Sequence, residues 1–166
     1  MTGTNATVAD TTTLNDDEVT LAHSYTEMSE ILMPNDTNNL GRALGGTVLH
    51  WMDICAAIAT RRFSGGLTVT AAMEGVEFLA PIEQGDIVTL SGYVFEAGRT
   101  SMDVKVAVTA ERPAAGEIRE TTTSFFTFVA VDGSHGTRAV PELVCPTDEQ
   151  RARRERALDQ RRSHRD

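Results

Sequence analysis

Residues 41–66 read GRALGGTVLHWMDICAAIATRRFSGG. The glycine pair Gly45-Gly46 precedes a long apolar stretch, and the basic pair Arg61-Arg62 followed by Gly65-Gly66 is typical of a helix end. We therefore predict one helix between the two glycine pairs. Apolar side chains occupy nearly all of its faces (Val48, Leu49, Trp51, Met52, Ile54, Ala56, Ala57 and Ile58). A helix that is hydrophobic all round is expected to be buried.

The sequence on either side of this helix has the two-residue hydrophobic period of β-strands. One strand is predicted before the helix and four after it, over residues 19–28, 67–79, 87–97, 102–110 and 118–131. The alternation in the second of these strands changes phase at Gly75, which predicts a bulge. The third and fourth strands form a predicted hairpin across residues 98–101.

The order of these elements indicates an α+β fold. Short turns between strands require antiparallel neighbours, and a sheet must bury one face against another element. Since the long apolar helix is the only predicted partner, we predict a hotdog fold, an antiparallel curved sheet wrapped around one long central helix. This domain is expected over residues 18–146. It follows a disordered acidic tail (1–17) and precedes a charged, solvated helix or tail (147–166) without an apolar face.

The charge of the chain argues against a nucleic-acid partner, since the formal net charge is −9 over 166 residues. Residues 147–166 hold seven arginines against five acidic residues, so the rest of the chain is strongly acidic. Lys105 is the only lysine. An acidic, lysine-poor surface is expected of a protein adapted to a salt-rich cytosol. A GC-rich genome gives the same bias, and both explanations stay open.

No targeting, membrane or metal-binding segment is predicted. No apolar run approaches the ~20 residues that span a bilayer, and the polar, acidic N-terminus does not resemble a signal peptide. We therefore expect a cytoplasmic protein with no membrane partner. The two cysteines, Cys55 and Cys145, are too few for a disulfide framework. Neither has a neighbouring Cys or His at the spacing of a metal site.

Asp53 is the only acidic residue in the predicted apolar helix. A buried carboxylate without a partner is energetically costly, so this residue needs either a partner or a catalytic purpose. The alternative to catalysis is a structural hydrogen bond to a backbone group or to His50, one turn earlier on the same helix face. Both interpretations fit the sequence.

The start of the helix and the loop before it carry two further candidates. Gly45-Gly46 allows a substrate to approach the backbone, where free N–H groups and the positive end of the helix dipole can hold a developing oxyanion. Close packing between helix and sheet explains a glycine pair equally well. Asn38 lies in the preceding loop, where its amide can orient a carbonyl or a water. An asparagine in a turn is also commonly only a turn residue.

Four motifs occur in order along the chain. Asn38-x-x-Gly41-x-x-x-Gly45-Gly46 is followed by Asp53, and then come FLAPIEQGD (78–86), GRTSM (98–102) and FTFVAVD (126–132), which runs on to Arg138-x-x-Pro141. Over residues 19–141 the chain resembles the hotdog-fold acyl-CoA hydrolases, the group of the bacterial acyl-CoA thioesterases and the brain-type mammalian enzymes. Each motif is weak alone, but their joint spacing is specific.

The resemblance implies an enzyme that hydrolyses acyl-CoA to a free fatty acid and coenzyme A. In it, Asp53 corresponds to the family's catalytic carboxylate, acting as general base on water or as nucleophile. Asn38 corresponds to an amide that works beside this carboxylate from the partner protomer. Gly46, with Gly45 beside it, corresponds to the N–H that polarises the thioester carbonyl. Leu44 stands where some relatives have His, which argues against a histidine-assisted mechanism.

The resemblance also implies the partners of this chain. The family's hotdog domains dimerise by joining sheets edge to edge and commonly assemble as hexamers, so a trimer of dimers is expected. Coenzyme A enters and leaves as part of substrate and product, and no separate cofactor is expected. The hairpin residues Arg99, Thr100 and Ser101 offer positive charge and hydroxyls to its phosphates. A solvated turn arginine is the alternative interpretation of Arg99.

Two other functions are open from the sequence. A hotdog dehydratase or hydratase needs an Asp/His pair that moves a proton at carbon, and no His accompanies Asp53 in such a motif. The other is a non-catalytic acyl-CoA-binding hotdog protein. Turnover of a thioester that is lost on replacement of Asp53 separates this binder from a thioesterase.

Overall fold

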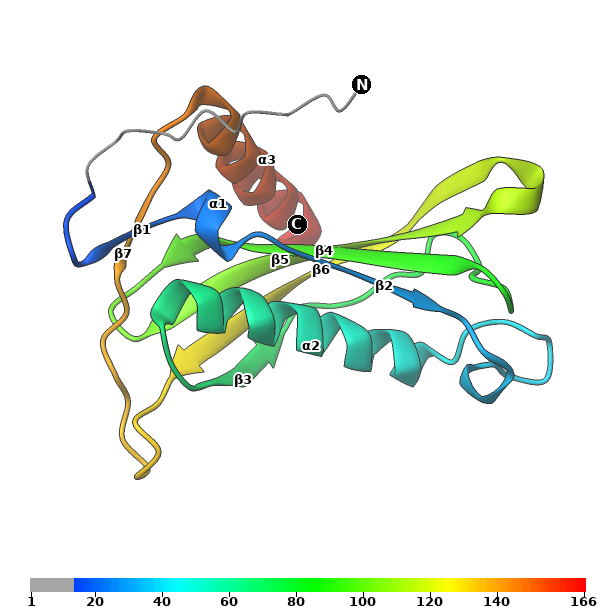
Figure 1. Ribbon diagram of the computed structural model, residues 1–166, viewed down its shortest axis with the longest axis horizontal. Helices are drawn as coiled ribbons and strands as arrows, with labels where there is room; N and C mark the ends of the chain where they lie inside the picture. The colour runs from blue at the N-terminus through cyan, green and yellow to red at the C-terminus, as the bar shows by residue number, and fades with distance from the viewer. Residues whose placement is uncertain (1–13) are drawn as a thin grey trace, which may run out of the picture.

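The computed structural model describes residues 14–166. The predicted tail (1–17) therefore lies mostly outside the described residues. The fold is α+β, as predicted: a five-stranded antiparallel sheet lies against one long helix, α2 (Figure 1). The strand order is β2-β4-β5-β6-β3, so β2 and β3 are the two edges. The strands are β2 (Thr26–Ile31), β3 (Thr68–Met73), β4 (Ile87–Ala97), β5 (Ser101–Arg112) and β6 (Glu117–Ala130).

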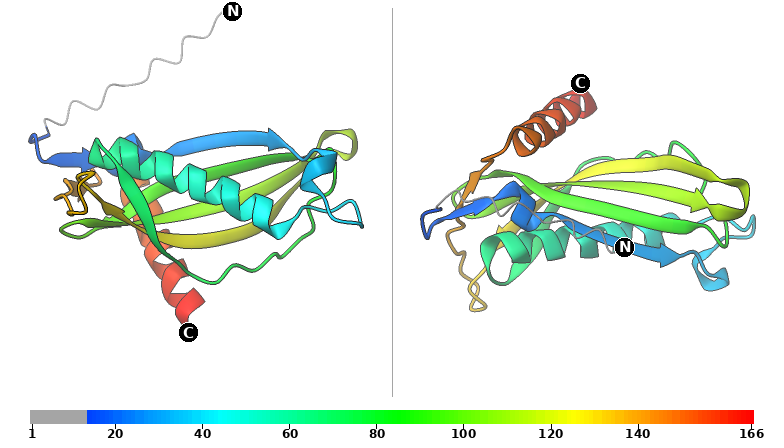
Figure 2. Two further views of the ribbon diagram at one scale, coloured as in Figure 1. Left: turned by 90° about the horizontal axis from the view of Figure 1, so that it is seen from below. Right: turned by 45° about the horizontal axis from the view of Figure 1, so that its top comes forward.

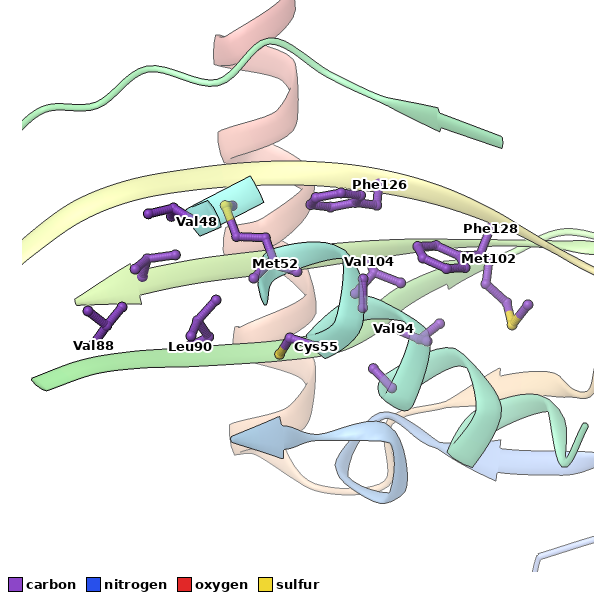
Figure 3. Packing of buried hydrophobic residues seen from close by; sticks show 14 of the residues in the cluster. Val48, Met52, Cys55, Val88, Leu90, Val94, Met102, Val104, Phe126 and Phe128 are labelled. Atoms are coloured by element: carbon purple, nitrogen blue, oxygen red, sulfur yellow. The ribbon is translucent and has the colours of Figure 1, made fainter. Parts of the chain in front are cut away.

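Helix α2 runs from Gly45 to Ser64 and ends at Gly65, whose left-handed backbone (φ 75°) suits glycine. It buries one face against the sheet, through residues spaced three or four apart: Val48, Met52, Cys55, Ala56, Ala59 and Phe63. The inward-facing residues of β4, β5 and β6 meet this face (Figure 3). The helix and the sheet thus share one continuous core.

The opposite face of α2 is open in a single copy of the chain. Leu49, Trp51, Ile54, Ala57 and Ile58 are only partly buried, and His50 is exposed. The prediction of a helix buried on every side was therefore wrong for one copy. The sheet lies on one side of α2 and does not surround it (Figure 2), so covering the second face requires another surface.

The predicted first strand is divided into three elements: β1 (Glu18–Thr20), the short helix α1 (Leu21–Ser24) and β2. The hydroxyl of Thr20 caps α1 by accepting from the N–H of His23 at 3.0 Å. The Ser24 hydroxyl accepts from the N–H of Val94 at 2.9 Å, which fixes α1 on β4. β1 pairs in parallel with β7 (Glu142–Val144), far along the chain. These capping and long-range bonds override the alternating pattern.

The predicted strand 67–79 is shorter in the structure, because β3 ends at Met73. Its bulge lies between Thr70 and Ala72 instead of at Gly75. Beyond Met73, two backbone bonds, from Glu74 to Phe125 (2.9 Å) and from Leu79 to Thr121 (2.8 Å), and two side chains of β6 hold the chain. The hydroxyls of Ser124 and Thr122 donate to the carbonyls of Glu74 (2.9 Å) and Glu77 (2.7 Å). The two short 3-10 helices are η1 (Pro34–Asp36) and η2 (Pro113–Ala115).

The C-terminal segment forms helix α3 (Asp148–Arg165), capped by the Thr147 hydroxyl. We expected it to be solvated, but it packs on the face of the sheet opposite α2 (Figures 1 and 2). Ala157 is fully buried there, in a cluster with Leu21, Tyr93, Phe95 and Phe125. The sequence pattern did not predict this because α3 has a very narrow apolar stripe. Most of the side-chain hydrogen bonds that attach it to the rest of the chain are donated by arginines (Arg151, Arg154, Arg161 and Arg165).

Candidate active site

Asp53 is paired with a residue on the neighbouring edge strand. The hydroxyl of Thr70 on β3 donates a hydrogen bond to Oδ1 of Asp53 at 2.6 Å. Asp53 is half-buried and Thr70 is exposed in a single copy. The bond joins the middle of α2 to the sheet edge and fixes the orientation of the carboxylate, while its second oxygen accepts no hydrogen bond from residues 14–166.

The observed partner of Asp53, Thr70, is neither of the two structural partners expected from the sequence, a backbone group or His50. No bond joins Asp53 to His50 within the described residues, although His50 lies one turn earlier on α2. Asp53 is also not deeply buried, because it lies between the core face of α2 and its open face. The carboxylate is thus oriented and still accessible, as a group that reacts must be.

The N-terminus of α2 presents free backbone donors. Leu44 occupies the N-cap position and offers no side-chain acceptor, and the first turn contains no acidic residue. The N–H groups of Gly45 and Gly46 have no acceptor among residues 14–166. A Cβ built on Gly46 would meet nothing within 4 Å, whereas one on Gly45 would lie 3.7 Å from the Phe78 ring. The Cβ position of Gly46 therefore faces open space.

Asn38 has a defined side-chain orientation in the loop before α2. Its Oδ1 accepts from the N–H groups of Leu40 (2.9 Å) and Arg42 (3.2 Å). Because both partners are donors, they fix which end of the amide is oxygen. The exposed Nδ2 group makes no hydrogen bond with the described residues. Asn38 is therefore a turn residue that also presents an NH₂ donor to its surroundings.

The turn before β4 supports the Asn38 loop. Backbone bonds join Ala43 to Ile82 (2.8 Å) and Gln84 to Gly41 (2.9 Å). The turn itself is fixed by the buried carboxylate of Asp86. This group accepts from the N–H of Glu83 at 2.9 Å, and from Arg112 and Arg119, each at 3.2 Å. The Gly85-Asp86 motif thus positions the start of α2 through this turn.

The hairpin candidates Arg99, Thr100 and Ser101 lie at the other end of α2. The Thr100 carbonyl accepts from Ala130, whose own carbonyl accepts from Arg138. The Arg138 guanidinium in turn donates to the Ser64 carbonyl at the helix C-terminus (2.9 Å). Since α2 has 20 residues, its two ends are separated by about 30 Å. One copy therefore does not bring Arg99 to Gly46.

The exposed side chain of Arg99 makes no hydrogen bond or ion pair with residues 14–166, so its guanidinium is available to a ligand.

Cys55 is fully buried beside Gly92, and burial raises the pKa of its thiol to about 12. It packs as a small apolar side chain, as predicted. Within the described part of the chain, no group of three His, Cys, Asp or Glu residues is placed to hold a metal.

Among residues 14–166, no helix combines the length and the apolar character needed to span a membrane.

A surface hollow of about 600 Å³ is lined by residues 74–77 with His164 and Arg165. It lies at the end of α3 and does not include Asp53. The candidate site is instead the open face of α2 beside β3.

Known proteins place this arrangement in a family. The model of the thioesterase superfamily matches residues 40–117. A Bacillus subtilis (strain 168) protein named uncharacterized acyl-CoA thioester hydrolase YkhA is 41% identical over 119 residues. The match covers 72% of this chain and 69% of the length of the Bacillus subtilis protein. The chain belongs to the acyl-CoA thioester hydrolases of the thioesterase superfamily. The resemblance expected from the four sequence motifs is thus confirmed.

Solved structures of similar hydrolases share this fold. An apo-hexameric acyl-CoA thioesterase superposes with a TM-score of 0.81 at 34% identity, covering 90% of this chain and 96% of that one. An acyl-CoA hydrolase from Staphylococcus aureus, solved with butyryl coenzyme A and coenzyme A, gives 0.78 at 28% identity, covering 89% and 92%. Variants of the Staphylococcus aureus hydrolase with one Asp, one Thr or one Asn replaced by Ala have also been solved.

Thr70 was missed by the sequence analysis. Its strand was predicted, but a threonine in a strand is an ordinary residue, and no local pattern distinguishes it from Thr68. Its contact with Asp53 depends on how the edge strand lies beside the helix. A bulge follows immediately after Thr70, and bulges commonly redirect side chains beside active sites.

Proposed function

We propose that this hydrolase cleaves acyl-CoA at the open face of α2, with Asp53 as the reacting carboxylate and Thr70 as its positioning partner. The observation that carries the proposal is the 2.6 Å bond from Thr70 to Asp53. It orients a half-buried carboxylate on the helix whose first N–H groups are free. A carboxylate and an oxyanion site are the two groups that thioester hydrolysis needs.

The Staphylococcus aureus variants support this assignment. In that hydrolase the replaced Asn lies fifteen residues before the replaced Asp, and the replaced Thr lies seventeen residues after it. Asn38, Asp53 and Thr70 have the same separations in this chain. Two of the three were singled out from the sequence, and the third is the residue that the hydrogen bond identifies.

The proposed chemistry begins with the thioester carbonyl oxygen at the free N–H of Gly46, with Gly45 beside it. These donors and the helix dipole stabilise the negative charge that develops on this oxygen. Asp53 takes a proton from the attacking water, or attacks the carbonyl itself to form an anhydride that water then opens. The carbon–sulfur bond breaks, and coenzyme A leaves as the thiol. No separate cofactor is required for either route.

A second copy is proposed to complete the site. One face of α2 is open, and the edge strand β3 exposes Val69 and Met73 beside it. The free Nδ2 of Asn38 then reaches the Asp53 of the partner protomer. Two sheets joined at β3 give a dimer, and three dimers give a hexamer like that of the apo-hexameric relative. In that assembly Arg99, Thr100 and Ser101 hold the phosphates of coenzyme A. A cytosolic location stays a prediction.

The test is a panel of acyl-CoA esters of increasing chain length, assayed for release of the free thiol. We expect turnover of at least one ester, with Asp53→Asn lowering kcat by about 10²–10⁴-fold. Asp159→Asn on α3 is the matched control, since among residues 14–166 Asp159 pairs only with Arg162 in its own helix. Binding of acyl-CoA without thiol release would instead support the non-catalytic binder. Reversible hydration of an enoyl-CoA would support the hydratase.

A further inference from the structure

The end of helix α3 is tied to the segment that follows the edge strand β3. The guanidinium of Arg165 donates to the carboxylate of Glu74, with its Nε at 2.8 Å. The ring Nε2 of His164 is bonded to the Gly75 carbonyl, at 2.6 Å. Glu74 directly follows Met73, the last residue of β3. Two consecutive residues of α3 therefore bind the two consecutive residues that follow this strand. The C-terminal end of α3 lies beside this segment of the chain (Figure 2, left).

In a single copy β3 is an edge strand, and the segment after it is held by α3 and by the backbone bond from the Glu74 N–H to the Phe125 carbonyl at 2.9 Å. Within the described chain only β6 pairs with β3, and the bulge between Thr70 and Ala72 interrupts that ladder. One oxygen of Glu74 is buried without a hydrogen-bond partner among residues 14–166, so its charge is balanced mainly through Arg165. The Glu74 side chain is only 25% exposed. Without Arg165, its charge would therefore be left largely buried and unpaired, which is energetically costly.

Helix α3 is also anchored one turn before Arg165. Arg161 is only 12% exposed and bridges Glu96 on β4 and Asp103 on β5. Its guanidinium also lies 4.9 Å from the centre of the Phe95 ring. The helix therefore spans from the central strands to the β3 edge as a fixed brace on the face opposite α2.

We propose that Arg165 is a positioning residue for hydrolysis: through Glu74 it holds β3 in the placement that brings the Thr70 hydroxyl to Asp53. Thr70 lies four residues before Glu74 on the same segment. The inference rests on the proposed function, because it acts on the Thr70–Asp53 bond. It assigns α3, which lies outside the residues matched by the family model, a part in the reaction on the opposite face of the sheet.

The test is a double-mutant cycle on kcat with full-length protein. Arg165→Ala is expected to lower kcat about two- to fivefold, the effect of one partly exposed ion pair, with KM unchanged. Arg162→Ala is the matched control in the same turn, since within the described residues Arg162 pairs only with Asp159. The kcat of this control is expected to equal that of the wild type. In a Thr70→Val background, Arg165→Ala is expected to have no further effect.

Hydrogen exchange supplies a second readout. The amides of β3 are expected to exchange faster in Arg165→Ala than in Arg162→Ala, and Arg165→Lys is expected to restore part of both kcat and protection. Equal losses of kcat in the wild-type and Thr70→Val backgrounds would overturn the inference, as would identical behaviour of Arg165→Ala and Arg162→Ala. Thr70→Val and Asp53→Asn with full activity would instead overturn the proposed function, so the two failures are distinguishable.

Discussion

The hydroxyl of Thr70 lies 2.6 Å from Oδ1 of Asp53, joining the edge strand β3 to the middle of the central helix. Replacing Thr70 with Val keeps the shape of the side chain and removes the donor. We expect kcat to fall about ten- to a hundredfold, which is the range for a hydrogen bond to a charged group. Thr70→Ser retains the hydroxyl and should keep most activity. Steady-state kinetics checks this, and equal losses in both variants would contradict a hydrogen-bonding role.

The open space at the Cβ position of Gly46 predicts that the Gly46→Ala protein folds well but reacts poorly. Because a Cβ there meets nothing within 4 Å, Gly46→Ala should unfold at the wild-type temperature or slightly above it. The added methyl group would narrow the space through which the thioester carbonyl is proposed to reach this N–H. We expect kcat/KM to fall at least about tenfold, with Thr47→Ala as the neighbouring control. Unchanged kcat/KM would show that the substrate does not approach this backbone.

Much of the fold was predictable because the strongest sequence patterns report on the core. The glycine pairs around α2 and the clean alternation of β5 correspond to real boundaries within a few residues. The two elements that were predicted wrongly, α3 and α1, are both held by polar contacts with residues far away in the sequence. Helix α3 shows little apolar periodicity, because arginine contacts attach it to the sheet, and the short helix α1 is fixed by the Ser24 bond to Val94 across 70 residues of sequence.

The candidate site was predictable only in part. Asp53 is conspicuous as the lone acid of an apolar helix; Asn38 and Gly46 were candidates from their places before and at the start of that helix, and the family resemblance gave them their roles. Thr70 is chemically unremarkable in the sequence, and its role depends on the placement of an edge strand. The separation of Arg99 from Gly46 by the length of α2 was equally unpredictable. Spacing along the sequence does not show whether a turn lies at the N-terminal or the C-terminal end of that helix.

Asp86 should matter for stability rather than for the chemical step. Its buried carboxylate accepts from Arg112, Arg119 and the backbone of Glu83. We expect Asp86→Ala to lower the free energy of unfolding by about 2–3 kcal/mol, measured by urea denaturation at fixed protein concentration. Asp159→Ala removes an exposed pair and should change it by less than about 0.5 kcal/mol. Equal effects would mean that the Asp86 bonds contribute little.

Arg99 is expected to act on binding alone. If its free guanidinium holds the nucleotide end of coenzyme A, it does so equally in the ground and transition states. Arg99→Ala should then raise KM about three- to tenfold and leave kcat nearly unchanged. The effect should disappear with an acyl-pantetheine, which lacks the pyrophosphate and the 3′-phosphate. The same rise in KM for both substrates would show that Arg99 acts through the fold.

The central claim is that Asp53 of one protomer works with Asn38 of the next, and subunit mixing tests it most directly. Asn38→Ala and Asp53→Ala proteins, each expected to be inactive, are mixed under conditions where subunit exchange is shown independently by mass spectrometry. In a mixed dimer one site regains both residues and the other loses both, so random pairing should restore about a quarter of wild-type activity. No recovery after proven exchange would contradict the shared site.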